Sequence, residues 1–242
     1  MKVSIVVPAF NEERYIGRCL SSIVNQSVSP DEIIVVDNNS TDKTAEIARS
    51  FNVKVISQKL PGTINARNLG FDSALYDVIA RTDADSVLDK NCVAEIKKYF
   101  QKNKNIDAVL GTHLYEGVPE GVNRTMFMQF MFTMQMLLGH IGLIGPSMII
   151  KSSAWKKVRS SLCKNDKEVH EDIDVSIHLN MLGLKIGYAP KVIVWTSTRR
   201  LINNPRSFFL EYPNRFLRMC KSHQIKSRVK LNLLKKIKLP NF

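Results

Sequence analysis

The stretch VSIVVPAF, residues 3–10, is nearly all apolar and is followed at once by the polar residues NEE. A strand that is buried on both faces has this composition, and such strands are typical of parallel sheets. EIIVVD (32–37), VKVIS (53–57) and DVIART (77–82) have the same character. We therefore predict that these four segments are strands of one sheet, with DAVLGTHLY (107–115) as a further strand.

Helical segments separate the strands. In EERYIGRCLSSIVNQ (12–26) the apolar side chains fall on one helical face, and we also expect helices over 40–51, 64–75 and 91–103. Alternating strands and helices predict an α/β fold: a Rossmann-like, mostly parallel sheet flanked by helices. Ligands bind such sheets beyond the carboxyl ends of the strands. The polar clusters at 8–12, 37–40 and 83–85 should therefore lie along one rim.

RTDADSVLD (81–89) places two carboxylates, Asp83 and Asp85, one residue apart directly after a predicted strand. Like charges this close repel, and burying them costs free energy unless a positive charge lies beside them. One interpretation is a polar loop, because loops are rich in Asp. The other is a divalent metal ion held against a phosphate. Two further polar clusters on the same rim favour the second.

The charge is concentrated at the C-terminal end. The 242 residues carry a net charge of +13, yet nine Lys or Arg and no acidic residue follow Glu211. We predict a domain over 1–211 and a basic amphipathic helical tail over 212–242, of the kind that meets nucleic acid or an anionic membrane. The four Cys lie far apart, and the N-terminus lacks the pattern of a secretory signal, so we expect a cytoplasmic protein with reduced thiols.

The second half is less regular. Residues 124–150 are rich in Met and Phe but interrupted by Gly and Gln, which makes them a poor membrane span. They fit either a core helix or an amphipathic element that touches lipid or an apolar acceptor. EDIDVSIHLNMLG (171–183) indicates a helix that ends at a glycine, and 185–200 indicates extended chain.

Five motifs occur together along the first 200 residues. These motifs are VVPAFNEE, IIVVDNNSTDKT, ARNLG, DAD and HED. Their order and spacing resemble those of the family 2 glycosyltransferases with a GT-A fold. The resemblance implies an inverting transfer of a sugar from a nucleotide-diphosphate sugar to an acceptor hydroxyl or phosphate, in glycan or glycolipid assembly. The Gln-x-x-Arg-Trp motif of processive synthases does not occur, which favours transfer of a single sugar.

The resemblance also implies roles for the donor side of the site. Pro8, Ala9, Asn11, Glu12 and Asp37 would hold the base and ribose, because carboxylates accept hydrogen bonds from ring N–H and hydroxyl groups. Asp37 favours UDP over GDP. The plainer alternatives are a turn residue for Asp37 and a helix N-terminal acid for Glu12.

Basic residues would complete the donor site. Arg67 would reach the Asp-x-Asp loop or the donor phosphates, or else lie solvated on its helix. Arg199 and Arg200 would close over the phosphates, because arginine suits phosphate geometry. Asp85, with Asp83, would hold Mg²⁺ or Mn²⁺, which neutralises the leaving nucleotide diphosphate.

Catalysis and acceptor binding are implied for two further motifs. In KEVHEDID (167–174), Asp172 would take the acceptor proton, with Glu171 and His170 in support. The alternatives are an exposed charged helix start and a metal ligand at His170. Gly145, Pro146 and Ser147 would line the acceptor site, or simply form a turn before a strand.

Rival functions fit the residues less well. A dinucleotide dehydrogenase is excluded because no Gly-x-Gly-x-x-Gly occurs, and PAFNEE lacks the glycines of a nucleotidylyltransferase loop. A non-catalytic protein that binds nucleic acid or membrane through the tail remains the alternative, although an acidic rim repels phosphate and we expect no nucleic acid. In the tail, Ile225, Val229, Leu233 and Ile237 recur every four residues among basic side chains. This pattern favours peripheral contact with an anionic membrane and a lipid-linked acceptor, or else packing on the domain.

Overall fold

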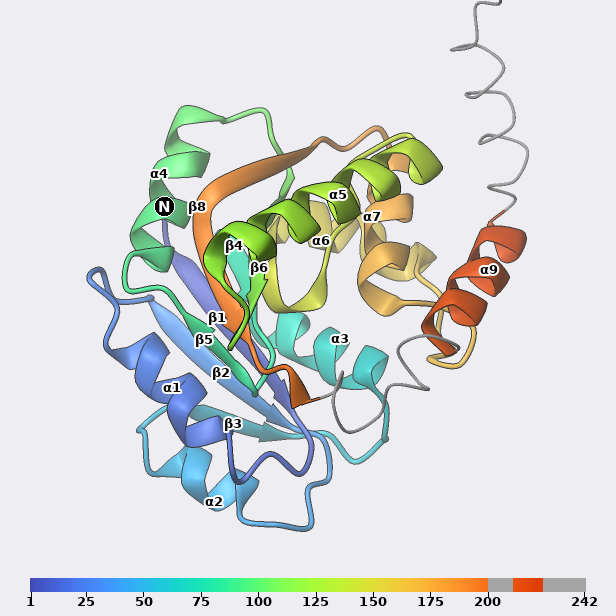
Figure 1. The fold of residues 1–242 in the computed structure, drawn as a ribbon. Helices are drawn as coiled ribbons and strands as arrows, with labels where there is room; N and C mark the ends of the chain where they lie inside the picture. The colour runs from blue at the N-terminus through green and yellow to red at the C-terminus, as the bar shows by residue number, and fades with distance from the viewer. Residues whose placement is uncertain (200–210, 224–242) are drawn as a thin grey trace, which may run out of the picture.

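The computed structural model describes residues 1–199 and 211–223, and its centre is one mixed sheet with helices on both faces (Figure 1). The described residues form eight strands in the order β3-β2-β1-β4-β7-β6-β8-β5. The strands are β1 Val3–Ala9, β2 Glu32–Asp37, β3 Lys54–Ser57, β4 Val78–Arg81, β5 Ser86–Leu88, β6 Ala108–Tyr115, β7 Met148–Lys151 and β8 Ile186–Thr196. The predicted α/β fold is confirmed.

The sheet has a parallel half and a mixed half. β1, β2, β3 and β4 pair in parallel, as the apolar segments predict. β7 enters antiparallel between β4 and β6, and β5 pairs antiparallel with β8. The parallel character predicted for the sheet is therefore limited to the first half and to the β6–β8 pair. The reason is local: β5 directly follows the polar loop after β4, with no helix between them to carry the chain back.

The helices form two layers. The helices are α1 Ile16–Val24, α2 Thr44–Arg49, α3 Thr63–Ser73, α4 Cys92–Lys102, α5 Glu120–Leu138, α6 Ser152–Val158, α7 Glu171–Met181 and α9 Tyr212–Ser222, with 3₁₀ turns at Gly145–Ser147 and Arg159–Ser161. One core cluster joins α1, α2 and α4 to one sheet face. A second joins α3, α5, α6 and α7 to the other. The sheet is thus buried on both sides, which its apolar strands require.

Gly70 sets the distance between α3 and the sheet. A Cβ at this position would lie 2.4 Å from Cγ1 of Val6 and 2.9 Å from Cγ2 of Val36, closer than side chains approach. The glycine of the ARNLG motif therefore lets α3 lie directly on β1 and β2.

α5 buries one face and exposes the other. Phe127, Met134 and Leu138 are buried against the rest of the molecule, whereas Met126, Phe130 and Phe132 on the outer side are exposed, Phe132 by 65%. The helix therefore joins the core through one face, as the first interpretation expects, and presents a second apolar face on the outside, as the second interpretation expects. Across residues 1–199 and 211–223, none of the helices combines the length and apolar character needed to cross a membrane.

α9 packs on the domain rather than standing apart from it. Met219 and Cys220 are buried in a cluster with Ile173 and Ile177 of α7. Figure 1 shows α9 beside α7 at the edge of the molecule. The predicted tail of 212–242 thus begins with a packed helix, while the apolar repeat over 225–237 lies outside the described residues.

Candidate functional site

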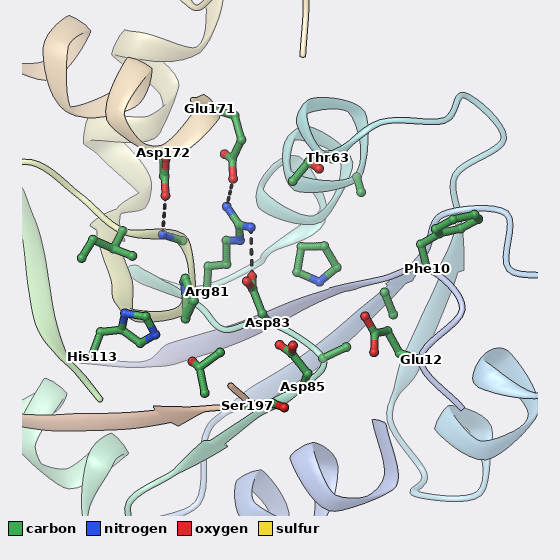
Figure 2. Close-up of a pocket in the computed structure, with 18 of the residues that line it drawn as sticks. Phe10, Glu12, Thr63, Arg81, Asp83, Asp85, His113, Glu171, Asp172 and Ser197 are labelled. Atoms are coloured by element: carbon green, nitrogen blue, oxygen red, sulfur yellow. Dashed lines mark hydrogen bonds and ion pairs between the residues drawn. The ribbon is translucent and has the colours of Figure 1, made fainter. Parts of the chain in front are cut away.

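A cavity of about 500 Å³ opens at the carboxyl ends of β1 and β4, in the size range of small-molecule sites. Figure 2 shows the acidic and basic side chains that converge on it from β4, the loops after β1 and β4, and α7. Most of the residues predicted from the sequence lie in its lining: Pro8, Ala9, Glu12, Asp83, Asp85, Gly145, Pro146, Glu171, Asp172 and Arg199. The rim expected from the strand pattern therefore exists.

Other predicted residues lie behind the lining. Asn11 has a positive φ of 53° and accepts a hydrogen bond from N of Thr41 at 2.8 Å, so it shapes the loop after β1. Asp37 is buried and accepts a hydrogen bond from N of Ser40 at 3.2 Å, while its neighbour Asn38 reaches the cavity. Ser147 is buried against Gly111. Arg200 lies outside the described residues.

The Asp-x-Asp loop is held by one arginine on each carboxylate. Oδ1 of Asp83 lies 3.0 Å from Nη2 of Arg81, and Oδ2 of Asp85 lies 3.0 Å from Nε of Arg199. Arg199 also forms an ion pair with Glu12 and stacks over the ring of Tyr15, with 4.3 Å to the centroid. Burial disfavours the charged guanidinium, but the bond to Glu12 and the charge of Asp85 outweigh it and raise the pKa of Arg199. The buried acids therefore have the positive partners that their repulsion requires.

The donor set at this loop suits a hard divalent cation. Asp83 and Asp85 are part-buried or buried carboxylates within the cavity lining, and carboxylate oxygens are the ligands that Mg²⁺ and Mn²⁺ prefer. His170 also lines the cavity and adds a nitrogen ligand type. These residues fit the predicted metal by their chemistry, with Arg199 providing the positive charge at Asp85 in this structure.

Glu171 lines the cavity and is anchored between two arginines. Its Oε2 lies 2.8 Å from Nη1 of Arg67, and its Oε1 forms an ion pair with Arg81. Arg67 is fully buried, also donates to the backbone carbonyl of Glu171 at 2.6 Å, and does not line the cavity. The structure therefore places Arg67 under α7, where it fixes the first turn of that helix, rather than at the donor phosphates.

Arg81 links the two acidic motifs, as Figure 2 shows. The same guanidinium bonds Asp83 on the loop after β4 and Glu171 at the start of α7. Burial disfavours its charge, yet Glu171 and Asp83 outweigh that effect and raise the pKa of Arg81. Arg81 therefore remains a permanent cation that ties the Asp-x-Asp loop to the α7 acids. This role is not predicted above, although an Arg that ends an apolar strand next to DAD is a usable signal in the sequence.

Asp172 is oriented by the backbone of the 3₁₀ turn. Its Oδ2 accepts a hydrogen bond from N of Gly145 at 2.8 Å, and its Oδ1 from N of Ile173 at 2.8 Å. Gly145 must be a glycine here because a Cβ would lie 2.9 Å from the guanidinium of Arg81. Glu171, Asp172 and Asp174 are also the first-turn acids of α7, where the helix dipole stabilises carboxylates. The acidic residues that begin α7 are therefore the same residues as those of the candidate catalytic motif.

His113 on β6 is a second lining residue that the sequence did not signal. It is 9% exposed, and its Nε2 has no hydrogen-bond partner among the described residues. Burial lowers the pKa of His113 to about 4, against the opposing charges of Asp83 and Asp172. The ring is therefore neutral near pH 7 and offers one nitrogen to a bound ligand. Further lining residues come from several elements: Asn38, Thr63, Tyr115, Thr196, Ser197 and Arg215.

Comparison with known sequences identifies the first two thirds of the chain. The profile described as Glycosyl transferase family 2 matches residues 4–158. The probable glycosyltransferase YdaM of Bacillus subtilis is 30% identical over 219 residues, which cover 80% of this chain and 50% of YdaM. The poly-beta-1,6-N-acetyl-D-glucosamine synthase of Staphylococcus epidermidis is 28% identical over 80% of this chain and 49% of its own length. The chain thus spans about half the length of these curated relatives.

Comparison with solved structures supports the fold. S. aureus TarS 1-349 in complex with UDP-GlcNAc superposes with a TM-score of 0.65 at 19% identity, covering 99% of this chain and 77% of TarS. Glucosyl-3-phosphoglycerate synthase of Mycobacterium tuberculosis, solved with Mn²⁺, UDP-Glc and phosphoglyceric acid, gives a TM-score of 0.64 at 20% identity, covering 92% and 80%.

Proposed function

The chain belongs to glycosyl transferase family 2, with a GT-A fold, and from that premise we propose that it transfers a single sugar, with inversion, from a nucleotide-diphosphate sugar to an acceptor hydroxyl. The observation that carries the proposal is the shared lining of one cavity by Asp83, Asp85 and Asp172. Such a site has one acidic pair for the diphosphate end of the donor and a separate carboxylate for the acceptor.

Asp172 is the general base in this proposal. Its carboxylate takes the proton of the acceptor hydroxyl as that oxygen forms a bond to the anomeric carbon, and the nucleotide diphosphate leaves with the electrons of the broken bond. Gly145 holds Oδ2 of Asp172 through its amide, which fixes the direction of the carboxylate. Glu171 is a positioning residue, because both of its oxygens are engaged by arginines.

In this proposal the donor is bound by the loop after β1 and by the carboxylates of Asp83 and Asp85. Pro8, Ala9 and Glu12 line the cavity where a ribose would lie, and a carboxylate at Glu12 accepts bonds from its hydroxyls. Asp37 at the end of β2 accepts from a ring N–H and favours UDP over GDP. Asp85 and Asp83 would hold a divalent cation, Mg²⁺ or Mn²⁺, which would neutralise charge on the leaving diphosphate. Arg199 would bind the donor phosphates through the edge of its guanidinium that does not contact Asp85 and Glu12.

His113 adds a contact for the sugar itself. The residue lines the cavity, and its buried, neutral Nε2 accepts or donates one hydrogen bond according to its tautomer. A sugar hydroxyl satisfies either case, and a buried nitrogen without a partner costs free energy until one is bound. We assign His113 to donor-sugar recognition.

The acceptor is proposed to be lipid-linked, with the protein peripheral at the cytoplasmic face of a membrane. Two observations support this: the outer face of α5 exposes Met126, Phe130 and Phe132, and the chain after Glu211 carries nine basic residues and no acidic one. Apolar side chains and clustered lysines are the two forces that hold a peripheral protein on anionic lipid. Gly145 and Pro146, next to Asp172, line the acceptor side of the cavity.

The catalytic part of the proposal is tested by a donor screen. Full-length protein is incubated with UDP-GlcNAc, UDP-Glc or GDP-Man, with Mn²⁺ or Mg²⁺, and release of the nucleotide diphosphate is followed. We expect metal-dependent release from at least one UDP-sugar. The absence of release from every donor with either metal, together with no binding of UDP in calorimetry, would remove the proposed activity.

The membrane part has its own test. Full-length protein is sedimented with anionic and with neutral vesicles, beside a variant with Gln at Lys226, Lys230, Lys235 and Lys236. A matched control carries Gln at the exposed Lys102, Lys104, Lys156 and Lys157. We expect the wild type and the control to pellet with anionic vesicles at low salt and the tail variant to remain in solution. Equal sedimentation of all three would contradict tail-mediated binding.

A further inference from the structure

Four potential metal ligands meet on the side of α7 that faces α9. Cys163 comes from the segment after α6, Asp174 and His178 are one turn apart on α7, and His223 directly follows α9. One ligand atom from each residue lies within 4.8 Å of all the others. Figure 1 shows α9 packed beside α7, the arrangement that brings His223 to the cluster. None of the four residues lines the cavity.

The distances among the ligand atoms are close to the edges of a tetrahedron around zinc, within a few tenths of an ångström for four of the six. Nε2 of His178 and Nε2 of His223 are 3.1 Å apart, and Oδ1 of Asp174 lies 3.5 Å and 3.0 Å from them. Sγ of Cys163 lies 3.7 Å from Nε2 of His223. With the usual zinc–ligand bond lengths, tetrahedral coordination requires separations of about 3.3–3.6 Å between such atoms. The four side chains are therefore spaced for one ion among them.

The surroundings of the ligands fix their orientation. Nδ1 of His223 lies 2.9 Å from the carbonyl oxygen of Met219, which places the ring hydrogen on Nδ1 and directs the Nε2 lone pair to the cluster. Oδ2 of Asp174 accepts a hydrogen bond from N of Cys163 at 3.0 Å, which leaves Oδ1 for the cluster. Asp174 is fully buried, and its Oδ1 has no donor in hydrogen-bonding geometry among the described residues. Burying this carboxylate oxygen is costly without a positive charge beside it, which a bound cation would supply.

We propose that Cys163, Asp174, His178 and His223 form a structural zinc site, separate from the metal at the Asp-x-Asp loop. A thiolate, two imidazoles and a carboxylate are ligands that Zn²⁺ takes in closed, four-coordinate sites, whereas Mg²⁺ and Mn²⁺ prefer oxygen. The site joins α9 to α7, and α9 carries Arg215 into the cavity lining. Zinc would thus fix the position of α9 and of Arg215, and its ligand Asp174 lies in the same first turn of α7 as Asp172.

The first test is the metal content of the full-length protein. The protein is produced with zinc in the medium, dialysed against metal-free buffer and measured by mass spectrometry for zinc. We expect about one zinc per chain in the wild type. We expect the same zinc content in Asp85→Asn, because that carboxylate belongs to the other site. Cys163→Ala and His178→Ala should contain almost none. Cys220→Ala is the matched control, because Cys220 is a buried thiol on α9 that is not one of the four ligands.

A second measurement uses the wild type, so its result does not depend on whether the variants fold. Zinc is removed with a chelator, and Co²⁺ is added to the stripped protein. A thiolate-to-cobalt charge-transfer band, with the intense visible bands of four-coordinate Co²⁺, is expected, and Zn²⁺ should abolish both. Zinc should also raise the Tm of the stripped wild type. If wild-type zinc is no higher than in Cys163→Ala and Co²⁺ gives no thiolate band, the cluster is a hydrogen-bonded Asp–His–His group and the zinc site is overturned.

Discussion

The backbone amide of Gly145 donates a hydrogen bond to Oδ2 of Asp172 at 2.8 Å, across 27 residues of sequence. The amide points one carboxylate oxygen in a fixed direction, and the absence of a Cβ at Gly145 leaves room for the guanidinium of Arg81 beside it. A general base works only when it is held within reach of the proton it takes. This pair of residues is therefore the part of the cavity on which the proposed proton transfer depends.

Replacing Asp172 by Asn should lower turnover by about 10²–10⁴-fold, because the amide cannot take the acceptor proton. Donor affinity should be unchanged, since Asp172 contacts the acceptor side. Turnover is measured as release of nucleotide diphosphate, and affinity by calorimetry. Glu168→Gln, an exposed acid three residues before Glu171, is the control and should match the wild type. Loss of donor binding with a high residual rate would make Asp172 a donor ligand instead.

Replacing Asp85 by Asn should abolish metal-dependent turnover and leave the fold intact, because an amide is a far weaker ligand for a hard cation. A chelator should have the same effect on the wild type. The comparison variant is Asp89→Asn, since Asp89 lies on the same stretch and is not in the cavity lining. Circular dichroism reports the fold. Full activity in excess EDTA, or of the Asp85 variant, would contradict the metal site.

Replacing Gly145 by Ala should reduce turnover by about 10²-fold with a small effect on stability, because the new Cβ displaces Arg81 or moves the amide away from Asp172. The expected change lies in kcat more than in KM. Gly142→Ala is the matched control in the same loop, because a Cβ at Gly142 meets its nearest neighbour at an ordinary 3.5 Å. Equal kcat in the two variants would show that the Gly145–Asp172 bond is dispensable.

His113 should make the protein less stable as the pH falls below neutral. Its pKa is about 4 in the folded protein, against about 6.5 for an unperturbed histidine. Between these values the unfolded chain binds a proton that the folded protein does not, so the free energy of unfolding falls as the pH falls through this window. At pH 5 the loss amounts to about 2 kcal/mol.

The His113 effect is isolated by comparison with His113→Gln in urea unfolding at pH 7 and pH 5. The wild type should lose about 2 kcal/mol more between the two pH values than the variant does, because all other groups titrate alike in both. Identical pH dependence in the two proteins would mean that His113 is charged or solvent-accessible in the folded state.

The sequence predicts the rim of the cavity because that rim depends on local signals. Apolar strands such as 3–10 end at the same edge of a parallel sheet, so the acids that follow them must gather there. Asp83 and Asp85 were placed in this way and Asp172 by the resemblance of its motif, and the structure brings all three to one cavity.

The sequence fails where a residue's role depends on distant partners. Arg67 looks like a donor ligand in the sequence and Arg81 gives no clear signal, yet both pair with Glu171, 104 and 90 residues away. On α5, Met and Phe occur on every side, so composition cannot tell that Phe127 is buried and Phe132 exposed. The four residues of the proposed zinc site, 163, 174, 178 and 223, have no recognised ligand spacing, and only the packing of α9 on α7 brings them together.

The most direct test of the proposed chemistry is the anomeric configuration of the sugar in the first product. NMR records this configuration while the full-length protein consumes an α-linked UDP-sugar in the presence of Mn²⁺. Direct displacement with Asp172 as the base predicts that the newly formed product is the β-anomer, and that Asp172→Asn slows its appearance without changing its configuration. An α-anomer as the first product would require retention of configuration, and would contradict a single displacement at this cavity.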